Sequence, residues 1–320
     1  MKKLFLIIAL ICCAWMEIQA QQFTPPPNRN AALRYWAAFA EMKDHPLDEA
    51  TGKLIDDVLN GSANWDEKRL GPIVEENAYA VRALQRAVDL PECNWGLDYS
   101  LGAAMPLAHL PKARVLARLN ALYGVRQLAH NDADSAVATW LAGLRFAQHV
   151  GNGVGLIGTL SAKPAFMANL HLLAAAVKSG AVNAELENKI RSALRQLPED
   201  GVPWVDSIKA EVWADEQGLE YLAKAPNFAA TSKEFFGKEP SAQDKPPSPS
   251  EIRAFHSLMN EVVAAFQLPI PQTQEKWQAI KARLNGMNPV VQAVVPNYGQ
   301  LNTSRQSVAG EMETLTKALK

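Results

Sequence analysis

Apolar residues recur every three or four positions through most of the chain, which is the spacing of helices that each bury one face. The clearest example follows Asp132, a favourable residue for capping a helix N-terminus. Its apolar side is formed by Ala136, Trp140, Leu144 and Ala147. No stretch shows the sustained alternation of a half-buried strand. The pattern therefore predicts an all-α protein.

Short connections separate the predicted helices between residues 31 and 225. Helix breakers and caps mark these connections, among them Pro111, Gly180, Asn183 and Pro203. Short connections leave neighbouring helices antiparallel. We therefore expect a domain of stacked antiparallel helical hairpins, arranged like an α-solenoid.

The first predicted helix illustrates which side chains the pattern places in the interior. Leu33, Trp36, Phe39 and Met42 lie three residues apart and share one face. Such a face normally packs against the core. We expect these four side chains to be buried.

Residues 226–250 interrupt the helical rhythm with a polar, proline-rich stretch that includes Lys245-Pro246-Pro247-Ser248-Pro249. Such a composition buries too little apolar surface to fold alone. We interpret the segment as a linker or surface excursion. Its large apolar residues, Phe228, Phe235 and Phe236, are expected to pin a loop to the core.

Helix resumes with an explicit start. Ser248 precedes Pro249, and Glu251 follows three residues after Ser248, which is a capping box. Residues 251–320 are predicted to be C-terminal helices that either extend the main stack or form a separate bundle. Because the last predicted helix reaches Lys320 without a stop signal, we expect a truncated chain.

The first twenty residues predict a signal peptide. Two lysines open the segment, an apolar run spans residues 4–14, and Ile18-Gln19-Ala20 is a plausible cleavage site. A proline-rich N-terminal segment, residues 21–30, follows. The apolar run is shorter than the ~20 residues needed to span a bilayer. We expect an exported protein, periplasmic or extracellular, without a transmembrane helix in its mature part.

Two alternatives for this segment are disfavoured. An uncleaved anchor is interrupted by Trp15 and Glu17. A lipoprotein would use Cys12 or Cys13, but a small residue normally precedes a lipidated cysteine, and Ile11 is large.

Charge and cysteine content narrow the function classes. The chain has 32 Lys and Arg against 33 Asp and Glu, so no net field favours nucleic acid or an anionic membrane. With Cys12 and Cys13 in the predicted signal peptide, only Cys93 remains and no internal disulfide can form. The six histidines lack ligand spacing, and no phosphate-binding or nucleophile motif is present. We expect no metal and no cofactor.

One predicted hairpin resembles a tetratricopeptide repeat. Gly124 lies in its first helix, Ala136 follows twelve residues later, and Trp140 comes one turn after that. Small residues at these positions let two helices approach closely, and the resemblance implies that Trp140 fills the groove between hairpins. The hairpin departs from the repeat pattern at Asn120 and Gln127, where large apolar residues are usual.

A broader resemblance covers most of the predicted mature chain. Residues 31–36, residues 93–98 and the hairpin after Pro111 are similar to a group of uncharacterised exported helical proteins of environmental bacteria. The resemblance implies a helical fold and export, and it implies no particular chemistry.

An acid pair is one candidate site. Glu211 and Asp215 lie one turn apart on a predicted helix, with Trp204, Trp213 and Tyr221 nearby in sequence. One protonated and one ionised carboxyl group beside aromatic rings could hydrolyse a glycosidic bond.

Exposure is the simpler interpretation of the same acids. They fall opposite Ile208, Val212 and Leu219, the apolar face of the helix. Acids in that position are typical of a solvated helix surface.

Residues 91–111 form the second candidate site, because they are long for a connection without helical periodicity. Trp95, Asp98 and Tyr99 could bind a sugar, a peptide or a cation. The competing interpretation is a packed loop with Trp95 buried. Cys93 in this loop is expected to be a buried thiol, because no histidine is close in sequence.

Two functions remain open at this point. The favoured hypothesis is a non-enzymatic scaffold that presents a hairpin surface to an envelope protein or peptide. The alternative is a cell-wall or polysaccharide hydrolase, or a carbohydrate-binding protein, that uses Glu211 and Asp215 or the loop from Trp95 to Tyr99.

Overall fold

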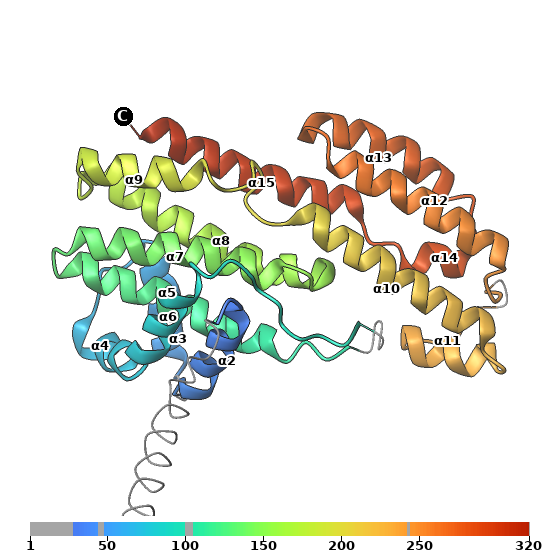
Figure 1. The fold of residues 1–320 in the computed structure, drawn as a ribbon, viewed down its shortest axis with the longest axis horizontal. Helices are drawn as coiled ribbons and strands as arrows, with labels where there is room; N and C mark the ends of the chain where they lie inside the picture. Colours follow the sequence, from blue (N-terminus) through green and yellow to red (C-terminus); the bar gives the residue numbers. More distant parts are fainter. Residues whose placement is uncertain (1–27, 44–47, 100–104, 242–243, 320) are drawn as a thin grey trace, which may run out of the picture.

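Helices account for about 74% of the computed structural model, which describes residues 28–43, 48–99, 105–241 and 244–319 (Figure 1). Within these ranges there is no strand, and one isolated bridge joins Asn30 to Glu92. The all-α prediction is confirmed. The predicted signal peptide, residues 1–20, and most of the proline-rich segment that follows it lie outside the described residues.

The helices follow one another with short connections. The first part of the chain forms α2 (Ala31–Glu41), α3 (Glu49–Leu59), α4 (Glu67–Glu76), α5 (Ala78–Ala87), α6 (His109–Ala129), α7 (Ala133–Gly151), α8 (Gly155–Lys178), α9 (Ala184–Leu194) and α10 (Trp204–Lys224). The second part forms α11 (Phe228–Phe236), α12 (Pro249–Phe266), α13 (Ile270–Leu284), α14 (Pro289–Val294) and α15 (Tyr298–Ala318).

The centre of the molecule is built by α6, α7 and α8, which pack on one another in chain order (Figure 1). The Trp140 indole lies against Gly124, where an added Cβ would come within 2.3 Å of Trp140 Nε1. Trp140 Nε1 donates to the carbonyl oxygen of Ala121 at 3.2 Å. The tryptophan therefore packs inside its own α6–α7 hairpin, and Gly124 makes room for it.

The two polar residues that depart from the repeat pattern are both bonded to Thr139. Asn120 is buried, and its Nδ2 donates to the Thr139 carbonyl oxygen at 2.9 Å. The Thr139 hydroxyl donates to Gln127 Oε1 at 2.8 Å. Hydrogen bonds thus join α6 and α7 where apolar contacts are usual.

The buried face of α2 differs in part from the predicted one, because Phe39 and Met42 are buried as expected but Leu33 and Trp36 are not. Leu33 and Trp36 are 59% and 38% exposed, whereas Tyr35 is completely buried. Helix α2 packs mainly on α5 and presents small residues, Ala31 and Ala38, to the core. Because alanines allow close approach, the buried stripe is rotated from the one that the large side chains suggested.

The predicted linker is partly helical, so the expectation of a loop there was wrong. Its first half forms α11, which Asn227 caps by accepting from Ala230 N at 3.2 Å. The helix lies on α10, with the Phe235 ring against Gly218. Composition underestimated this segment because α10 supplies the apolar surface that it lacks.

The C-terminal helices extend the main core. Helix α12 packs on α10, and α15 packs on α8, so their buried side chains join one continuous apolar cluster. The capping box is present: Glu251 N donates to Ser248 Oγ at 3.3 Å, and Ser248 N donates to Glu251 Oε2 at 2.7 Å. Of the two predicted alternatives, a separate bundle is excluded.

Among the described helices, one, α8, is long and apolar enough to cross a membrane by length and composition. It packs on α6 and α7 and, from the other side, on α10 and α15. Ile157 and Leu160 near its start remain exposed.

A buried guanidinium joins three segments of the fold. Arg305 Nε on α15 pairs with Asp200 Oδ2 at 2.5 Å, in the connection between α9 and α10. Its Nη1 donates to Thr273 Oγ1 at 3.0 Å, and its Nη2 donates to the Leu268 carbonyl oxygen at 3.2 Å. The cation also lies 5.8 Å from the centre of the Phe266 ring. These bonds hold the C-terminal helices to the rest of the core.

We expect Arg305→Met to lower the free energy of unfolding by ~3 to 5 kcal/mol, because it leaves the Asp200 carboxylate buried without its partner. Arg305→Lys should recover little of this loss, since an ammonium cannot reproduce the fork of donors. Urea unfolding measures both. The matched control is Arg283→Met, which breaks an exposed pair with Glu261 and should cost less than ~1 kcal/mol. Equal losses for the two methionine variants would contradict a structural role for Arg305.

Candidate functional site

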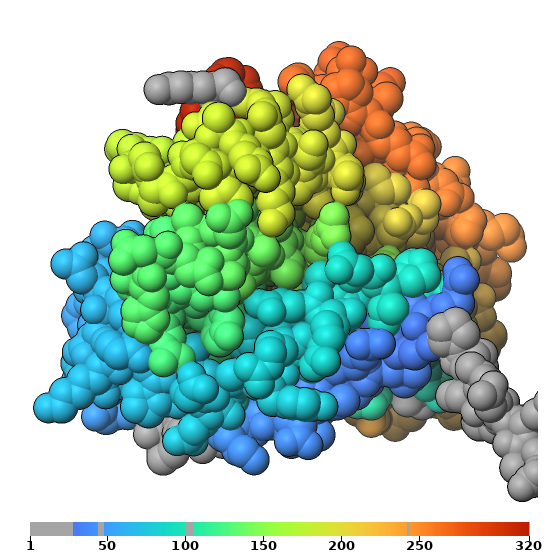
Figure 2. Space-filling model, turned by 60° about the vertical axis from the view of Figure 1, so that its left-hand side comes forward, coloured from blue at the N-terminus to red at the C-terminus, as the bar shows by residue number. Residues whose placement is uncertain are grey.

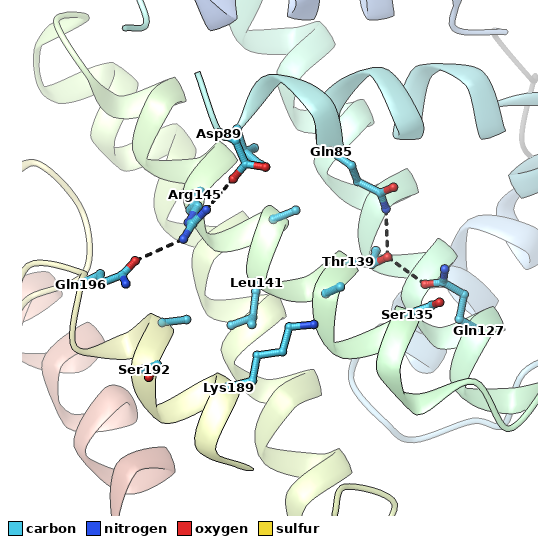
Figure 3. Close-up of a pocket in the computed structure, with 14 residues that line it drawn as sticks. Gln85, Asp89, Gln127, Ser135, Thr139, Leu141, Arg145, Lys189, Ser192 and Gln196 are labelled. Carbon is cyan, nitrogen blue, oxygen red and sulfur yellow. Dashed lines mark hydrogen bonds and ion pairs between the residues drawn. The ribbon is translucent and has the colours of Figure 1, made fainter. Parts of the chain in front are cut away.

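Helices α5, α7 and α9 enclose a groove of about 520 Å³ (Figure 3). The surface that they form is seen in Figure 2, where the segments succeed one another in sequence order from blue through green to yellow. Small and apolar side chains line the middle of the groove, including Val88, Ala138, Leu141, Ala142 and Ala193. Polar side chains stand at its two ends.

At one end, amides and a hydroxyl form a chain of hydrogen bonds (Figure 3). Gln85 Nε2 donates to Thr139 Oγ1 at 2.9 Å, and Thr139 Oγ1 donates to Gln127 Oε1 at 2.8 Å. Within the described chain, the side-chain carbonyl oxygen of Gln85 (Oε1) and the side-chain amino group of Gln127 (Nε2) make no further hydrogen bond. One acceptor and one donor are therefore held in place and unused.

At the other end, Arg145 connects two helices. Its Nη1 pairs with Asp89 Oδ1 at 2.6 Å, and its Nη2 donates to Gln196 Oε1 at 3.2 Å. Lys189 projects from α9 across the groove (Figure 3). Among the described residues its ammonium group makes no ion pair. Lys189 is thus a cation in the groove whose charge is not balanced by an ion pair within the described part of the chain.

The sequence-predicted loop does not gather its candidates into one site. Trp95 is only 5% exposed, its Nε1 donates to the His149 carbonyl oxygen at 2.9 Å, and its ring stacks on His109 with centroids 4.4 Å apart. Asp98 and Tyr99 remain exposed. The Tyr99 hydroxyl donates to the Gly153 carbonyl oxygen at 2.5 Å. The competing interpretation, a packed loop with Trp95 buried, is correct for Trp95, which is part of the core.

Neighbouring titratable groups are held in their neutral forms. Cys93 is half-buried, and burial raises the pKa of its thiol to about 12. Burial lowers the pKa of His149 to about 4, and His149 Nδ1 shares a 2.7 Å hydrogen bond with the Tyr35 hydroxyl. Cys93 is therefore half-buried rather than fully buried as the sequence predicts, and it carries little thiolate to act as a nucleophile.

Glu211 serves as an internal cap for α8. Its Oε2 accepts from Leu156 N at 3.0 Å, at the start of that helix. Gly155 there has a φ of +71°, and a Cβ on it would lie 2.7 Å from Glu211 Oε2. A helix N-terminus stabilises negative charge. The carboxylate thus occupies the position that an anionic ligand would take.

Asp215 lies one turn further along α10. One of its carboxyl oxygens is buried and, within the described part of the chain, has no hydrogen-bond partner. Burial and the charge of Glu211 raise the pKa of Asp215 to about 8. Burial, together with the charges of Asp215 and Glu211, raises the pKa of Tyr298 on α15. Asp215 is therefore mainly protonated at neutral pH.

Glu211 and Asp215 are each half-buried, so the expectation that they lie on a solvated surface holds only in part. They are opposite the apolar face of α10, but α8 covers that side at its N-terminus, and Tyr298 of α15 approaches from the C-terminal part. The part of α10 that carries these acids is therefore partly covered, while Trp213 and Tyr221 on the same helix remain exposed. A helical wheel for α10 alone contains no signal for this second layer.

Sequence analysis did not identify the residues of the groove. They come from α5, α7 and α9 and from the end of α6, so no local spacing unites them. The one signal in the sequence was the pair of polar departures in the hairpin, of which Gln127 lines the groove.

No protein-family model matches the chain, and comparisons with curated proteins and with solved structures give no significant match. Among the described residues, no cluster of three or more His, Cys, Asp or Glu side chains could hold a metal ion. The geometry of the groove and of the acid pair is therefore the basis of the functional proposal.

We expect Asp215→Asn to flatten the dependence of stability on pH. The folded chain keeps the Asp215 proton up to about pH 8, whereas the unfolded chain releases it above about pH 4. The wild-type free energy of unfolding should therefore fall between these pH values, by up to ~1.4 kcal/mol per pH unit from this group. Asparagine has a similar shape and no charge, so the variant should lack this decline in urea unfolding from pH 5 to 8.

The control is Asp206→Asn, an exposed acid on the same helix that pairs with Lys209. This variant should keep the wild-type pH dependence. If Asp215→Asn also keeps it, the Asp215 carboxyl group is ionised in the folded protein.

Proposed function

We propose that this chain is an exported helical protein that binds a protein or peptide in the groove between α5, α7 and α9. The observation that carries the proposal is the ordering of polar side chains at both ends of the groove, with hydrogen-bonding groups left unused. Groups held in place before binding lose little conformational freedom on complex formation. A shaped hollow with a few fixed polar groups is the usual form of a binding site.

The arrangement of the helices supports a scaffold role. Helices α6, α7 and α8 pack on one another in chain order, as neighbouring helices do in an α-solenoid, and solenoid stacks present extended surfaces to partners. The close contact of Gly124 with Trp140 supports a tetratricopeptide-like hairpin. We include both the solenoid arrangement and this likeness in the proposal.

Export is supported by the pattern of the first twenty residues. In that case the partner is a protein or peptide of the cell envelope or the medium. The balanced charge of the chain favours neither nucleic acid nor an anionic membrane as the partner.

A photoreactive residue at Ser192, inside the groove, should form a covalent adduct with the partner when the protein is produced in its host. The same residue at Lys281, exposed on α13, should not. Ala138→Trp, which fills the groove from an exposed position, should abolish the Ser192 adduct. Adducts of equal yield at both positions, or none, would contradict binding in the groove.

A second candidate function is hydrolysis of a glycosidic polymer, favoured by the protonated Asp215 beside Glu211. A protonated carboxyl group beside a second acid is the pattern of an acid–base pair. The use of Glu211 as a cap for α8 argues for a structural role instead.

If this second function holds, Glu211→Gln and Asp215→Asn should each lower turnover of cell-wall polymers by about 100-fold or more, while Ala138→Trp leaves it unchanged. Circular dichroism of each variant confirms that it is folded. Unchanged turnover in folded Asp215→Asn protein removes the acid pair as a catalytic site.

A further inference from the structure

The unused hydrogen-bonding groups of the groove complement a peptide backbone. Every peptide unit offers one N–H donor and one C=O acceptor. The Gln85 carbonyl oxygen can accept the first, and the Gln127 amino group can donate to the second. Both amides are fixed through Thr139, so they keep this pairing without a ligand. An extended segment exposes such units, whereas a helix uses them internally.

The charges in the groove favour an acidic ligand. Its lining contains two cations, Arg145 and Lys189, and one anion, Asp89. Arg145 is already neutralised by Asp89 at 2.6 Å. Lys189 extends across the opening without an ion-pair partner in the described residues (Figure 3). A carboxylate beside Lys189 would complete a charge-assisted hydrogen bond.

The rest of the lining disfavours other ligand classes. None of the side chains that line the groove is aromatic, so a nucleobase or a sugar ring finds no ring on which to stack. The alanines in the middle of the groove, Ala138, Ala142 and Ala193, leave room for a backbone to lie close to α7 and α9.

We infer that the groove binds an extended, acidic peptide segment of the partner, with a Glu or Asp side chain paired to Lys189 and the backbone held by Gln85 and Gln127. This inference rests on the proposed function and specifies its ligand.

The test uses fluorescent hexapeptides with blocked ends, so that only side chains carry charge. One peptide alternates Ser with Glu, a second replaces each Glu by Gln, and a third replaces it by Lys. Fluorescence polarisation should give a Kd about tenfold lower for the Glu peptide than for the Gln peptide, a difference that shrinks as NaCl rises from about 50 to about 500 mM.

Lys189→Glu should remove the preference for the Glu peptide and favour the Lys peptide. The matched control, Lys281→Glu on α13, makes the same change of charge away from the groove and should leave the preference intact. Gln85→Ala should raise the Kd of the Glu and Gln peptides by a similar factor, because Gln85 contacts the peptide backbone, which the two peptides share.

The remaining outcomes separate the two levels of the proposal. If the Glu and Gln peptides bind equally well and the Ala138→Trp variant binds neither, the acidic preference is overturned and the groove stays the binding site. Peptides that bind with no effect of either Lys189→Glu or Ala138→Trp would overturn both the inference and the proposed function.

Discussion

The buried guanidinium of Arg305 is the interaction on which the arrangement of the fold depends. A charge removed from water must be balanced where it lies, and Arg305 finds its partners in Asp200 and Leu268, from two separate connections, and in Thr273 of α13. Those contacts place α15 across the core. With α15 fixed, Tyr298 at its start is close enough to interact electrostatically with Asp215, and one carboxyl oxygen of Asp215 is buried. One buried ion pair thus helps to set the environment of a second titratable site.

The groove and the α6–α7 hairpin share a single polar cluster. Thr139 is bonded to Asn120 within the hairpin and to Gln85 and Gln127 at the edge of the groove. The polar residues that weaken the likeness to a tetratricopeptide repeat therefore serve two purposes. They align two helices, and they hold the groups that a ligand would meet. Leucine at Asn120 and Gln127 would be closer to the repeat pattern, but it would remove both the alignment of the two helices and the ordered polar groups.

The sequence was informative where local rules decide the structure. The capping box at Ser248 and the apolar face of α12 follow from neighbours within one or two turns, and both are present. The exposure of Leu33 and the burial of one Asp215 carboxyl oxygen depend on helices distant in the chain, which periodicity does not include. The groove was missed for the same reason, since Lys189 and Gln85 come together only after α5, α7 and α9 have packed.

Cys93 has a consequence for how the protein reaches its native state. Its half-buried thiol is kept protonated and lies near the His149 carbonyl oxygen, and no other cysteine follows residue 13. In an oxidising compartment, a chain with this one half-buried thiol has no disulfide pairing to select and no wrong disulfide to correct. If the chain is exported, as we propose, its maturation would need neither a thiol oxidase nor a disulfide isomerase.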